Sequence, residues 1–139
     1  MNNINSLKLE IQNKKIKPSL IRIKIYEFLK NTKEHPDAEI IYQKLKKEIP
    51  TLSRASVYNA LKLFVEKGII KEIKIEKDLI RYDGDILRHA HFKCKKCGIL
   101  IDIEIKEKNY ELMIKNKNIK ILEEQIYLFG LCDKCNKKS

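Results

Sequence analysis

The side chains with the most evident chemistry lie close together in residues 89–98. Successive side chains of a β-strand alternate between its two faces, so His89 and His91 would point the same way and share one metal ion. Cys94 and Cys97 have the Cys-x-x-Cys spacing of a zinc knuckle, and the glycine after them allows a tight turn in which backbone amides approach the sulfurs. One short segment therefore predicts ligands for two different metal ions.

A second Cys-x-x-Cys pair, Cys132 and Cys135, follows later in the chain. Two such pairs can place four thiolates around one tetrahedral Zn(II), which leaves no open coordination position for catalysis. A redox-active pair is the alternative, but thioredoxin-type sites use one motif at the start of a helix, whereas both pairs here adjoin expected strands. In a reducing compartment the arrangement favours metal over disulfides. We therefore predict a structural zinc site made of Cys94, Cys97, Cys132 and Cys135.

The remaining candidate ligands are a third histidine, His35, and several carboxylates. A lone histidine is more often a satisfied polar residue than a ligand, and the His-x-His pair is the more characteristic metal signal. The candidate carboxylates are Asp83, Asp85, Asp102 and Glu104. Together with the imidazoles they form a mixed nitrogen and oxygen set, which suits Fe(II), Mn(II) or Zn(II).

Three helices and a hairpin are expected to precede the His-x-His segment at 89–91. The elements are helices over residues 20–30, 36–47 and 54–67 and strands over 71–76 and 79–83. Pro36 would lie in the first turn of the second helix, while Ser53 would cap the third helix and Gly68 would end it. This order is typical of a winged helix-turn-helix whose last helix enters the major groove of DNA. The residues expected to face the core from the first two helices are Ile21, Ile25, Phe28, Leu29, Ile40, Ile41 and Leu45.

The pattern changes after residue 83. Isoleucines alternate with other residues from Ile99 to Ile105, which predicts a half-buried strand. An amphipathic helix over 106–117 and a strand over 119–131 are expected to follow. So small a unit cannot bury much core alone, and we therefore expect zinc and self-association to complete it.

The length suits one domain or two small ones, and the composition indicates a nucleic-acid partner. We predict an α+β fold, with an N-terminal winged-helix DNA-binding domain over 1–83 and a small dimerisation and zinc-binding domain over 84–139. The 30 Lys and Arg outnumber the 19 Asp and Glu, giving a formal net charge of +11, which indicates a phosphate-rich partner. A generally lysine-rich surface is the alternative. Because no apolar run of membrane-spanning length is present, we expect a soluble cytoplasmic protein with no membrane contact.

The order of these motifs resembles the ferric uptake regulator family. The matching features, over about residues 14–136, are the helix-turn-helix, His-Pro at 35–36, Ser-x-Ala-Ser-Val-Tyr at 53–58, Arg-Tyr-Asp at 81–83, His-x-His, Cys-x-x-Cys-Gly and the C-terminal Cys-x-x-Cys. The resemblance implies a homodimeric repressor with a structural Zn(II) and a regulatory Fe(II) or Mn(II) between its domains. It also implies that the regulatory ion would be bound by His35, Asp83, His89, His91 and Asp102.

Within that family the chain is most similar to the peroxide-responsive branch, which typically has aspartate at the position of Asp102 where iron-uptake regulators often have glutamate. The resemblance then implies that bound Fe(II) reacts with hydrogen peroxide and that a liganding histidine, His35 or His89, is oxidised, which releases operator DNA. An iron-responsive repressor without peroxide sensing is the alternative. Contacts to double-stranded DNA are expected from Lys15, Lys17, Arg54, Ser56, Tyr58, Asn59 and Lys62.

Two other classes of protein fit the residues less well. A zinc hydrolase or deaminase would need an open zinc site with a nearby carboxylate base, but the four-cysteine set is closed and His-x-His is not His-Glu-x-x-His. A zinc-ribbon RNA-binding protein would share the charge and the cysteines, but it has no need of His35, Asp83 and Asp102 together. We therefore expect a DNA-binding regulator and not an enzyme.

Overall fold

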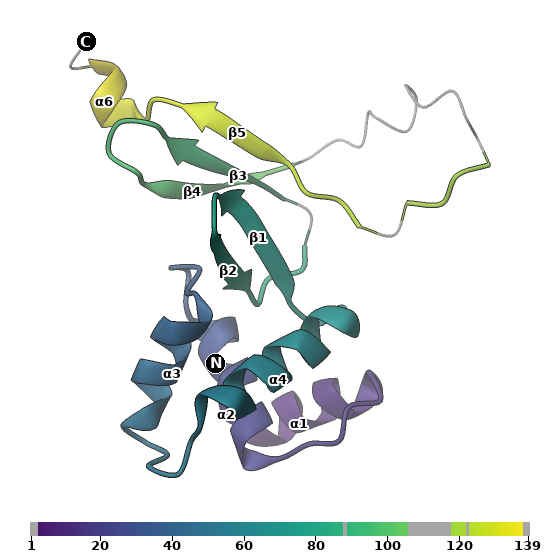
Figure 1. Ribbon diagram of the computed structural model, residues 1–139. Coiled ribbons are helices and arrows are strands. Elements are labelled where there is room, and N and C mark those ends of the chain that lie inside the picture. Colours follow the sequence, from purple (N-terminus) through teal and green to yellow (C-terminus); the bar gives the residue numbers. More distant parts are fainter. Residues whose placement is uncertain (1–2, 88, 106–117, 122, 138–139) are drawn as a thin grey trace. The chain divides into compact units, whose positions relative to one another are not determined.

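The computed structural model describes residues 3–87, 89–105, 118–121 and 123–137. The chain divides into two compact units, Met1–Ile86 and Leu87–Ser139, which are called the N-terminal and the C-terminal unit below. Figure 1 shows that the N-terminal unit is mainly helical with one hairpin, whereas the C-terminal unit is built on a small sheet. Among the described residues, no helix has the length and apolarity needed to cross a membrane.

Four helices build the N-terminal unit, and each begins at a polar cap. The side chain that precedes each helix accepts a hydrogen bond from a backbone N–H three residues further on, which satisfies one of the amides that a helix start leaves unpaired. The helices are α1 (Ile4–Asn13), α2 (Leu20–Asn31), α3 (Ala38–Lys46) and α4 (Arg54–Glu66), and their caps are Asn3, Ser19, Asp37 and Ser53. The prediction that α4 starts at a Ser53 cap and stops before Gly68 is confirmed.

One apolar core holds these helices together. Tyr26 of α2 and Phe64 of α4 meet edge to face at its centre, with 5.9 Å between ring centroids. The core continues through every helix into the hairpin. Its buried members are Leu7, Ile11, Ile16, Ile23, Ile25, Tyr26, Leu29, Ala38, Ile41, Leu45, Leu52, Val57, Ala60, Leu61, Phe64, Ile69, Ile70 and Tyr82.

Two details of α3 differ from the sequence prediction. Ile40 is 39 % exposed rather than core-facing, because Ile41 and Leu45, one turn apart, fill the inward side of this short helix. Pro36 lies before the cap Asp37 rather than in the first turn. Its carbonyl instead accepts a hydrogen bond from the backbone N–H of Tyr82 at 2.9 Å, so the residues before α3 are tied to a strand.

That strand belongs to the predicted hairpin, which is confirmed at its predicted bounds. Strand β1 (Lys71–Glu76) pairs antiparallel with β2 (Leu79–Asp83). The register is regular from Lys71 opposite Asp83 and then shifts before Glu76, which lies opposite Leu79. Together with α2, α3 and α4, the hairpin forms the winged helix-turn-helix expected from the sequence.

The C-terminal unit contains a three-stranded sheet in the order β4-β3-β5. Strand β3 (His89–Cys94) pairs antiparallel with β4 (Leu100–Glu104) and parallel with β5 (Tyr127–Gly130). A short helix, α6 (Asp133–Lys137), follows β5 in the chain. The predicted strand over 119–131 is wrong for the described residues 119–121 and 123–126, which form no strand; β5 starts at Tyr127, opposite His91. The helix predicted over 106–117 lies outside the described residues.

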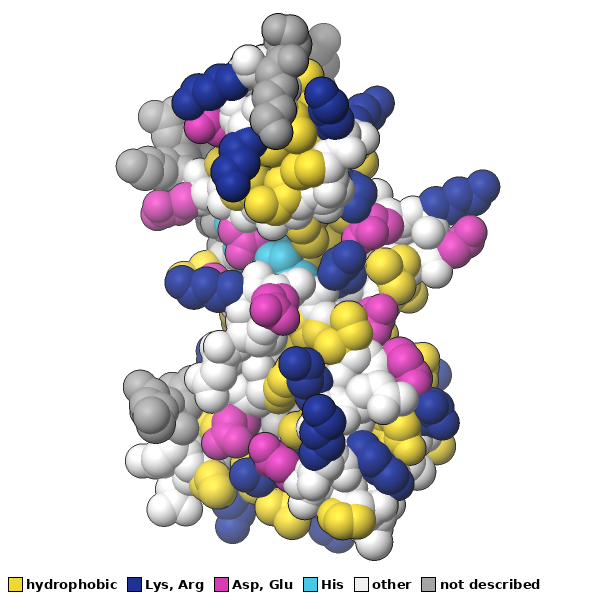
Figure 2. All heavy atoms as spheres, turned by 90° about the vertical axis from the view of Figure 1, so that its left-hand side faces the viewer, with side chains coloured by type: hydrophobic (Ala, Val, Ile, Leu, Met, Phe, Trp, Pro, Cys, Tyr) yellow, Lys and Arg dark blue, Asp and Glu magenta, His cyan; other side chains and the backbone are white. Residues whose placement is uncertain are grey.

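The two faces of this sheet differ in chemistry. Register places Phe92, Ile101, Ile103 and Leu128 on one face, while the histidines of β3 and the acidic residues of β4 occupy the other. Ile101 and Ile103 are each 37 % exposed and Leu128 is 44 % exposed, so the apolar face is much less covered than the core of the N-terminal unit. Figure 2 shows apolar side chains gathered near the top of the view, on the C-terminal unit. The α+β fold class predicted from the sequence is confirmed.

Candidate metal centres and nucleic-acid interface

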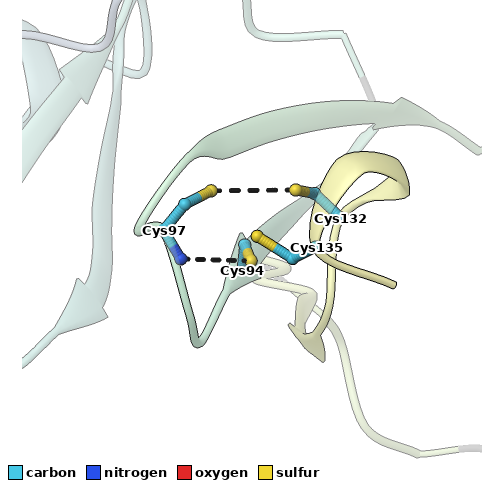
Figure 3. A group of neighbouring side chains, drawn as sticks. All are labelled: Cys94, Cys97, Cys132 and Cys135. Carbon is cyan, nitrogen blue, oxygen red and sulfur yellow. Dashed lines mark hydrogen bonds between the residues drawn. The ribbon is translucent and has the colours of Figure 1, made fainter. Parts of the chain in front are cut away.

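The four cysteines converge at one end of the C-terminal sheet. Cys94 ends β3 and Cys97 lies in the turn after it, whereas Cys132 and Cys135 lie just before and within α6. The four sulfur atoms all lie within 4.8 Å of one another. Figure 3 shows the four side chains pointing toward one another, with 3.7 Å between the sulfurs of Cys97 and Cys132. The two Cys-x-x-Cys pairs, predicted from their spacing to come together, therefore form a compact set of four thiols.

Backbone geometry around the first pair supports this arrangement. Gly98 has φ +82°, a left-handed conformation that side chains rarely adopt, and this lets the chain turn tightly after Cys97. In the same turn the backbone N–H of Cys97 donates to the sulfur of Cys94 at 3.4 Å. Such N–H···S contacts stabilise a thiolate and are part of the outer shell of a metal site.

The local environment makes two of the thiols, those of Cys94 and Cys135, unequal. Hydrogen bonds from backbone groups, first that of Cys97, lower the pKa of Cys94 to about 5. The pKa of Cys135 is raised to about 12, first by its side-chain contact with Cys132 and then by burial. Cys94 is thus the first of the two to become a thiolate, the form that binds metal.

The cysteine geometry fits a zinc ion. Four thiolates at the usual Zn–S distance of about 2.3 Å in a tetrahedron have sulfurs about 3.8 Å apart, close to the 3.7 Å between Cys97 and Cys132. Cys94, Cys132 and Cys135 are buried and Cys97 is exposed, so three of the four thiols are shielded from solvent. A four-cysteine set of this kind suits structural Zn(II).

A second set of donors lies on the polar face of the same sheet. His91 pairs with Asp102 across β3 and β4, and His89 occupies the same face two residues earlier. The two imidazole Nε2 atoms are 3.0 Å apart. One oxygen of Asp102 lies 3.5 Å from Nε2 of His91 and 3.8 Å from that of His89. Three different donor atoms therefore point at one small volume.

The orientation of the His89 ring leaves its Nε2 nitrogen able to bind a metal ion. Its Nδ1 lies 2.8 Å from the carbonyl oxygen of Leu87, and a carbonyl only accepts, so this hydrogen bond requires the proton on Nδ1. In the neutral imidazole, the form that binds metal, the lone pair is then on Nε2, the atom that faces His91 and Asp102. Ligands at metal distances of about 2.1 Å are about 3.0–3.5 Å apart. The separations of 3.0 Å and 3.5 Å lie in this range and that of 3.8 Å lies just above it, so this set is close to the geometry of a divalent ion site.

The N-terminal unit brings two further predicted ligands together. His35 and Asp83 are both buried, and Nδ1 of His35 lies 3.8 Å from a carboxylate oxygen of Asp83. The other oxygen of Asp83 accepts the backbone N–H of Asp85 at 2.9 Å. A Cβ on Gly84 would come within 2.6 Å of the Leu29 carbonyl oxygen, so only glycine lets the chain after Asp83 pass this close to α2.

The remaining candidate carboxylates have different surroundings. Asp85 is exposed, and its backbone N–H donates to the carboxylate of Asp83. Glu104 is also exposed and lies opposite His89 in the sheet register. Asp102 is the β4 carboxylate that lies within 4 Å of both imidazoles.

The outer face of α4 carries the residues predicted to read DNA. Tyr58 is 50 % exposed, and Asn59 and Lys62 are exposed beside it. All three line a cavity of about 450 Å³ between α4 and the hairpin. Glu66 and Glu72 line the same cavity and add negative charge that phosphates would avoid. This distribution favours base contacts at the start of α4.

Arg54 is held at the start of α4 by a residue of the preceding helix. Its guanidinium donates to both carboxylate oxygens of Glu39, at 2.9–3.3 Å, and stacks over the ring of Tyr42 at 4.5 Å. The hydrogen bonds from Arg54 lower the pKa of Glu39 to about 2. Glu39 was not apparent from the sequence, because it is 15 residues away from its partner.

The other residues of the predicted DNA surface differ in their exposure and hydrogen bonding. Lys15 and Lys17 are exposed after α1, and Lys15 has a left-handed φ of +61°. Ser56 is different: its backbone N–H donates to Ser53 Oγ at 3.1 Å, and the two hydroxyls lie 2.8 Å apart. Ser56 therefore takes part in the cap of α4.

The N-terminal unit is a winged helix, and the C-terminal unit carries a four-cysteine set together with imidazole and carboxylate donors. This combination is typical of a two-unit transcriptional regulator. Residues 13–129 match the model of the ferric uptake regulator family. The chain therefore belongs to that family, whose members are transcriptional regulators.

Several relatives with known names agree with this assignment. The chain is 32 % identical to the peroxide operon regulator of Bacillus subtilis over 116 residues, covering 82 % of this chain and 80 % of the relative. It is 29 % identical to the peroxide-responsive repressor PerR of Staphylococcus aureus, covering 82 % and 78 %. The solved Campylobacter jejuni peroxide stress regulator is 28 % identical, with a TM-score of 0.70 over 97 % of this chain and all of that one.

Proposed function

We propose that this protein is a metal-dependent transcriptional repressor that senses hydrogen peroxide through oxidation of its own metal-binding histidines. The observation that carries the proposal is the convergence of His89, His91 and Asp102, whose donor atoms lie 3.0–3.8 Å apart on one sheet face. Mixed imidazole and carboxylate donors suit Fe(II) and Mn(II). The chain is similar to a peroxide operon regulator, a peroxide-responsive repressor and a peroxide stress regulator, which supports peroxide as the signal.

In this proposal the regulatory ligands come from both units. His35 and Asp83 belong to the N-terminal unit, and His89, His91 and Asp102 belong to the C-terminal unit. An ion bound by all five would favour the relative orientation of the units in which all five can reach it. The ion can shift the population of orientations only to the extent that it binds one orientation more tightly than the others.

The favoured orientation matters because we expect two chains to bind DNA together. The half-exposed apolar face of the sheet, with Ile101, Ile103 and Leu128, is suited to cover the same face of a second copy. A homodimer would then present two α4 helices to two half-sites of operator DNA. Tyr58 and Asn59 would contact bases, and the basic residues would contact phosphates, so binding should weaken steeply with salt. The proposed phosphate contacts are Lys15, Lys17, Arg54 and Lys62.

Peroxide would act on the ligands themselves. Bound Fe(II) supplies the reactivity toward peroxide, with the net result that an imidazole carbon gains one oxygen atom and hydrogen peroxide is reduced to water. The candidate targets are His35 and His89. An imidazole oxidised in this way donates less well to a metal, so the two units would no longer be held in the orientation that binds the operator.

The test compares metal forms of one protein. An operator is first selected from random duplexes with the Mn(II)-loaded protein, and binding is then followed by fluorescence anisotropy before and after about stoichiometric peroxide. We expect loss of binding, with one oxygen added to His35 or His89 by mass spectrometry, in the Fe(II) form and not in the Mn(II) form. Iron-dependent binding that survives peroxide with unmodified histidines would instead establish an iron-responsive repressor.

A conservative substitution tests the role of Asp102. Asp102→Glu keeps the carboxylate but lengthens it by one methylene, so metal-dependent operator binding should persist while peroxide sensitivity falls. Asp85→Glu is the matched control, because it lengthens an exposed carboxylate that lies outside the proposed ligand set. Equal peroxide sensitivity in both variants would remove Asp102 from the argument for peroxide sensing.

A further inference from the structure

His35 has an unusual backbone conformation for a buried residue. Its φ is +52° and its exposed fraction is 3 %. Residues other than glycine rarely adopt left-handed φ values, because Cβ then approaches backbone oxygen. Such a conformation persists only where surrounding contacts enforce it, and it often marks a functional position. The contacts that fix His35 are therefore of interest for its role as a proposed ligand.

Those contacts come from strand β2 of the hairpin. Nη1 of Arg81 donates to the backbone carbonyl of His35 at 3.1 Å. The next residue of the strand, Tyr82, donates its backbone N–H to the carbonyl of Pro36 at 2.9 Å. A further isolated bridge joins Asp37 to Arg81. The segment that contains His35 is thus held along its backbone by two consecutive residues of β2.

Arg81 is itself oriented by Glu76 at the end of β1. Nε and Nη2 of the guanidinium donate to the two carboxylate oxygens of Glu76, and both side chains are mostly buried, with exposed fractions of 24 % and 19 %. Because the guanidinium is planar, fixing one edge on Glu76 also fixes the direction of Nη1, which contacts His35. The register shift before Glu76 brings it opposite Leu79, two residues from Arg81.

We propose that Arg81, oriented by Glu76, is a positioning residue for the regulatory metal ion, because it holds His35 in the conformation that presents its imidazole. The inference rests on the proposed function, since it requires His35 to bind the ion. It adds that both proposed ligands of the N-terminal unit depend on β2: Asp83 is its last residue, and His35 is fastened to it by Arg81. The hairpin therefore takes part in metal binding as well as in the winged-helix fold.

The test measures metal affinity directly on full-length, zinc-loaded protein. Binding of Mn(II) is followed by loss of the free-ion signal in electron paramagnetic resonance. Outer-shell partners of metal ligands typically contribute 10–100-fold in affinity, so we expect Arg81→Ala to weaken Mn(II) binding at least tenfold. Lys74→Ala is the matched control, because Lys74 is a cation of the same hairpin that pairs with Glu72 at 3.9 Å and is 63 % exposed. It should bind Mn(II) like the unaltered protein.

Two further variants separate positioning from charge and from folding. Arg81→Lys keeps the charge but not the planar fork, so its Mn(II) affinity should also fall. Glu76→Gln keeps Arg81 but weakens its orientation, and a smaller loss of affinity is expected. At saturating Co(II), the visible spectrum of Arg81→Ala should shift toward that of His35→Ala, a change that a general loss of stability would not produce.

The possible results separate this inference from the function on which it rests. If unaltered protein binds Mn(II) and Arg81→Ala binds it equally well with an unchanged Co(II) spectrum, the positioning role is wrong while the proposed function stands. If unaltered protein does not bind Mn(II), or His91→Ala binds it equally well, the proposed regulatory site fails and the inference with it. Should Arg81→Ala not fold, unchanged Mn(II) affinity in Glu76→Gln would overturn the inference.

Discussion

The N-terminal unit buries a continuous cluster of apolar side chains from all four helices and the hairpin, whereas the described buried cluster of the C-terminal unit consists of Cys94, Cys132 and Cys135 with Phe92 packed against them. The same C-terminal unit leaves Ile101, Ile103 and Leu128 of its sheet more than a third exposed. Burial of apolar surface is the main source of folding free energy. We therefore expect the N-terminal unit to be stable through its own core and the C-terminal unit to depend on a metal ion and a partner surface.

Loss of a zinc ligand should have the largest effect and act on one unit only. Cys94→Ser removes a fully buried thiol, and structural Zn(II) contributes on the order of 10 kcal/mol to folding of small domains. We expect the zinc content to fall to near zero and backbone amides of β3 and β4 to lose protection in hydrogen exchange, while α2 and α4 stay protected. Lys95→Ala, in the same turn but with all four thiols intact, should keep both zinc and protection.

The opposite result would break the comparison. A zinc-free Cys94→Ser protein with β3 amides still protected would mean that the sheet unit has enough core of its own. Loss of protection in α2 and α4 as well would mean that the two units fold as one.

A core substitution tests the other side of the comparison. Phe64 has no exposed surface and packs edge to face on Tyr26, so Phe64→Ala should destabilise the N-terminal unit by about 3–5 kcal/mol. Urea unfolding followed by the helical circular dichroism signal would measure this change, and the bound zinc should remain. Phe129→Ala removes an aromatic side chain that is 51 % exposed in the C-terminal unit, and it should leave the helical transition where it was.

An intermediate effect is expected where the sheet is proposed to meet a second copy. Ile103→Lys places a charge on the apolar face, and we expect the dimer to dissociate at least tenfold more readily, which is about 1.4 kcal/mol. Leu9→Lys is the control, since Leu9 is a large apolar residue of α1 that is 59 % exposed in the other unit. Sedimentation equilibrium of both variants would decide. Equal dimer affinities would show that the apolar face is not the contact between copies.

Local signals explain which parts of the fold could be predicted. The cap Ser53, the stop at Gly68 and the hairpin turn are encoded within a few residues, and the structure confirms them. The spacing of Cys94 and Cys97 likewise identified a compact thiol set, because ligands three apart in a tight turn converge by local geometry. A similar local rule put His89 and His91 on one face.

The features that escaped prediction depend on residues far apart in sequence. Strand β5 is shorter than expected because it pairs in parallel with β3, and periodicity contains no information on where a partner strand begins. Ile40 turns outward because two neighbours already fill the inner side of a short helix. The contact of Arg81 with the His35 carbonyl joins residues 46 apart, so only the folded chain reveals it.

The smallest effect is expected from an ion pair on the surface of the N-terminal unit. The hydrogen bonds from Arg54 lower the pKa of Glu39 in the folded chain from 4.5 to about 2, so the pair stabilises the fold while Glu39 is ionised. This contribution is fully present above pH 4.5 and is lost as the pH falls toward 2. Because the Arg54 and Glu39 side chains are 58 % and 46 % exposed, Glu39→Gln should lower the melting temperature at neutral pH by no more than about 2 °C. The difference between Glu39→Gln and unaltered protein should vanish near pH 2; a difference that persists there would show that the substitution acts through packing and not through charge. A loss as large as that of Phe64→Ala would mean that the surface of this unit contributes as much to its stability as the core.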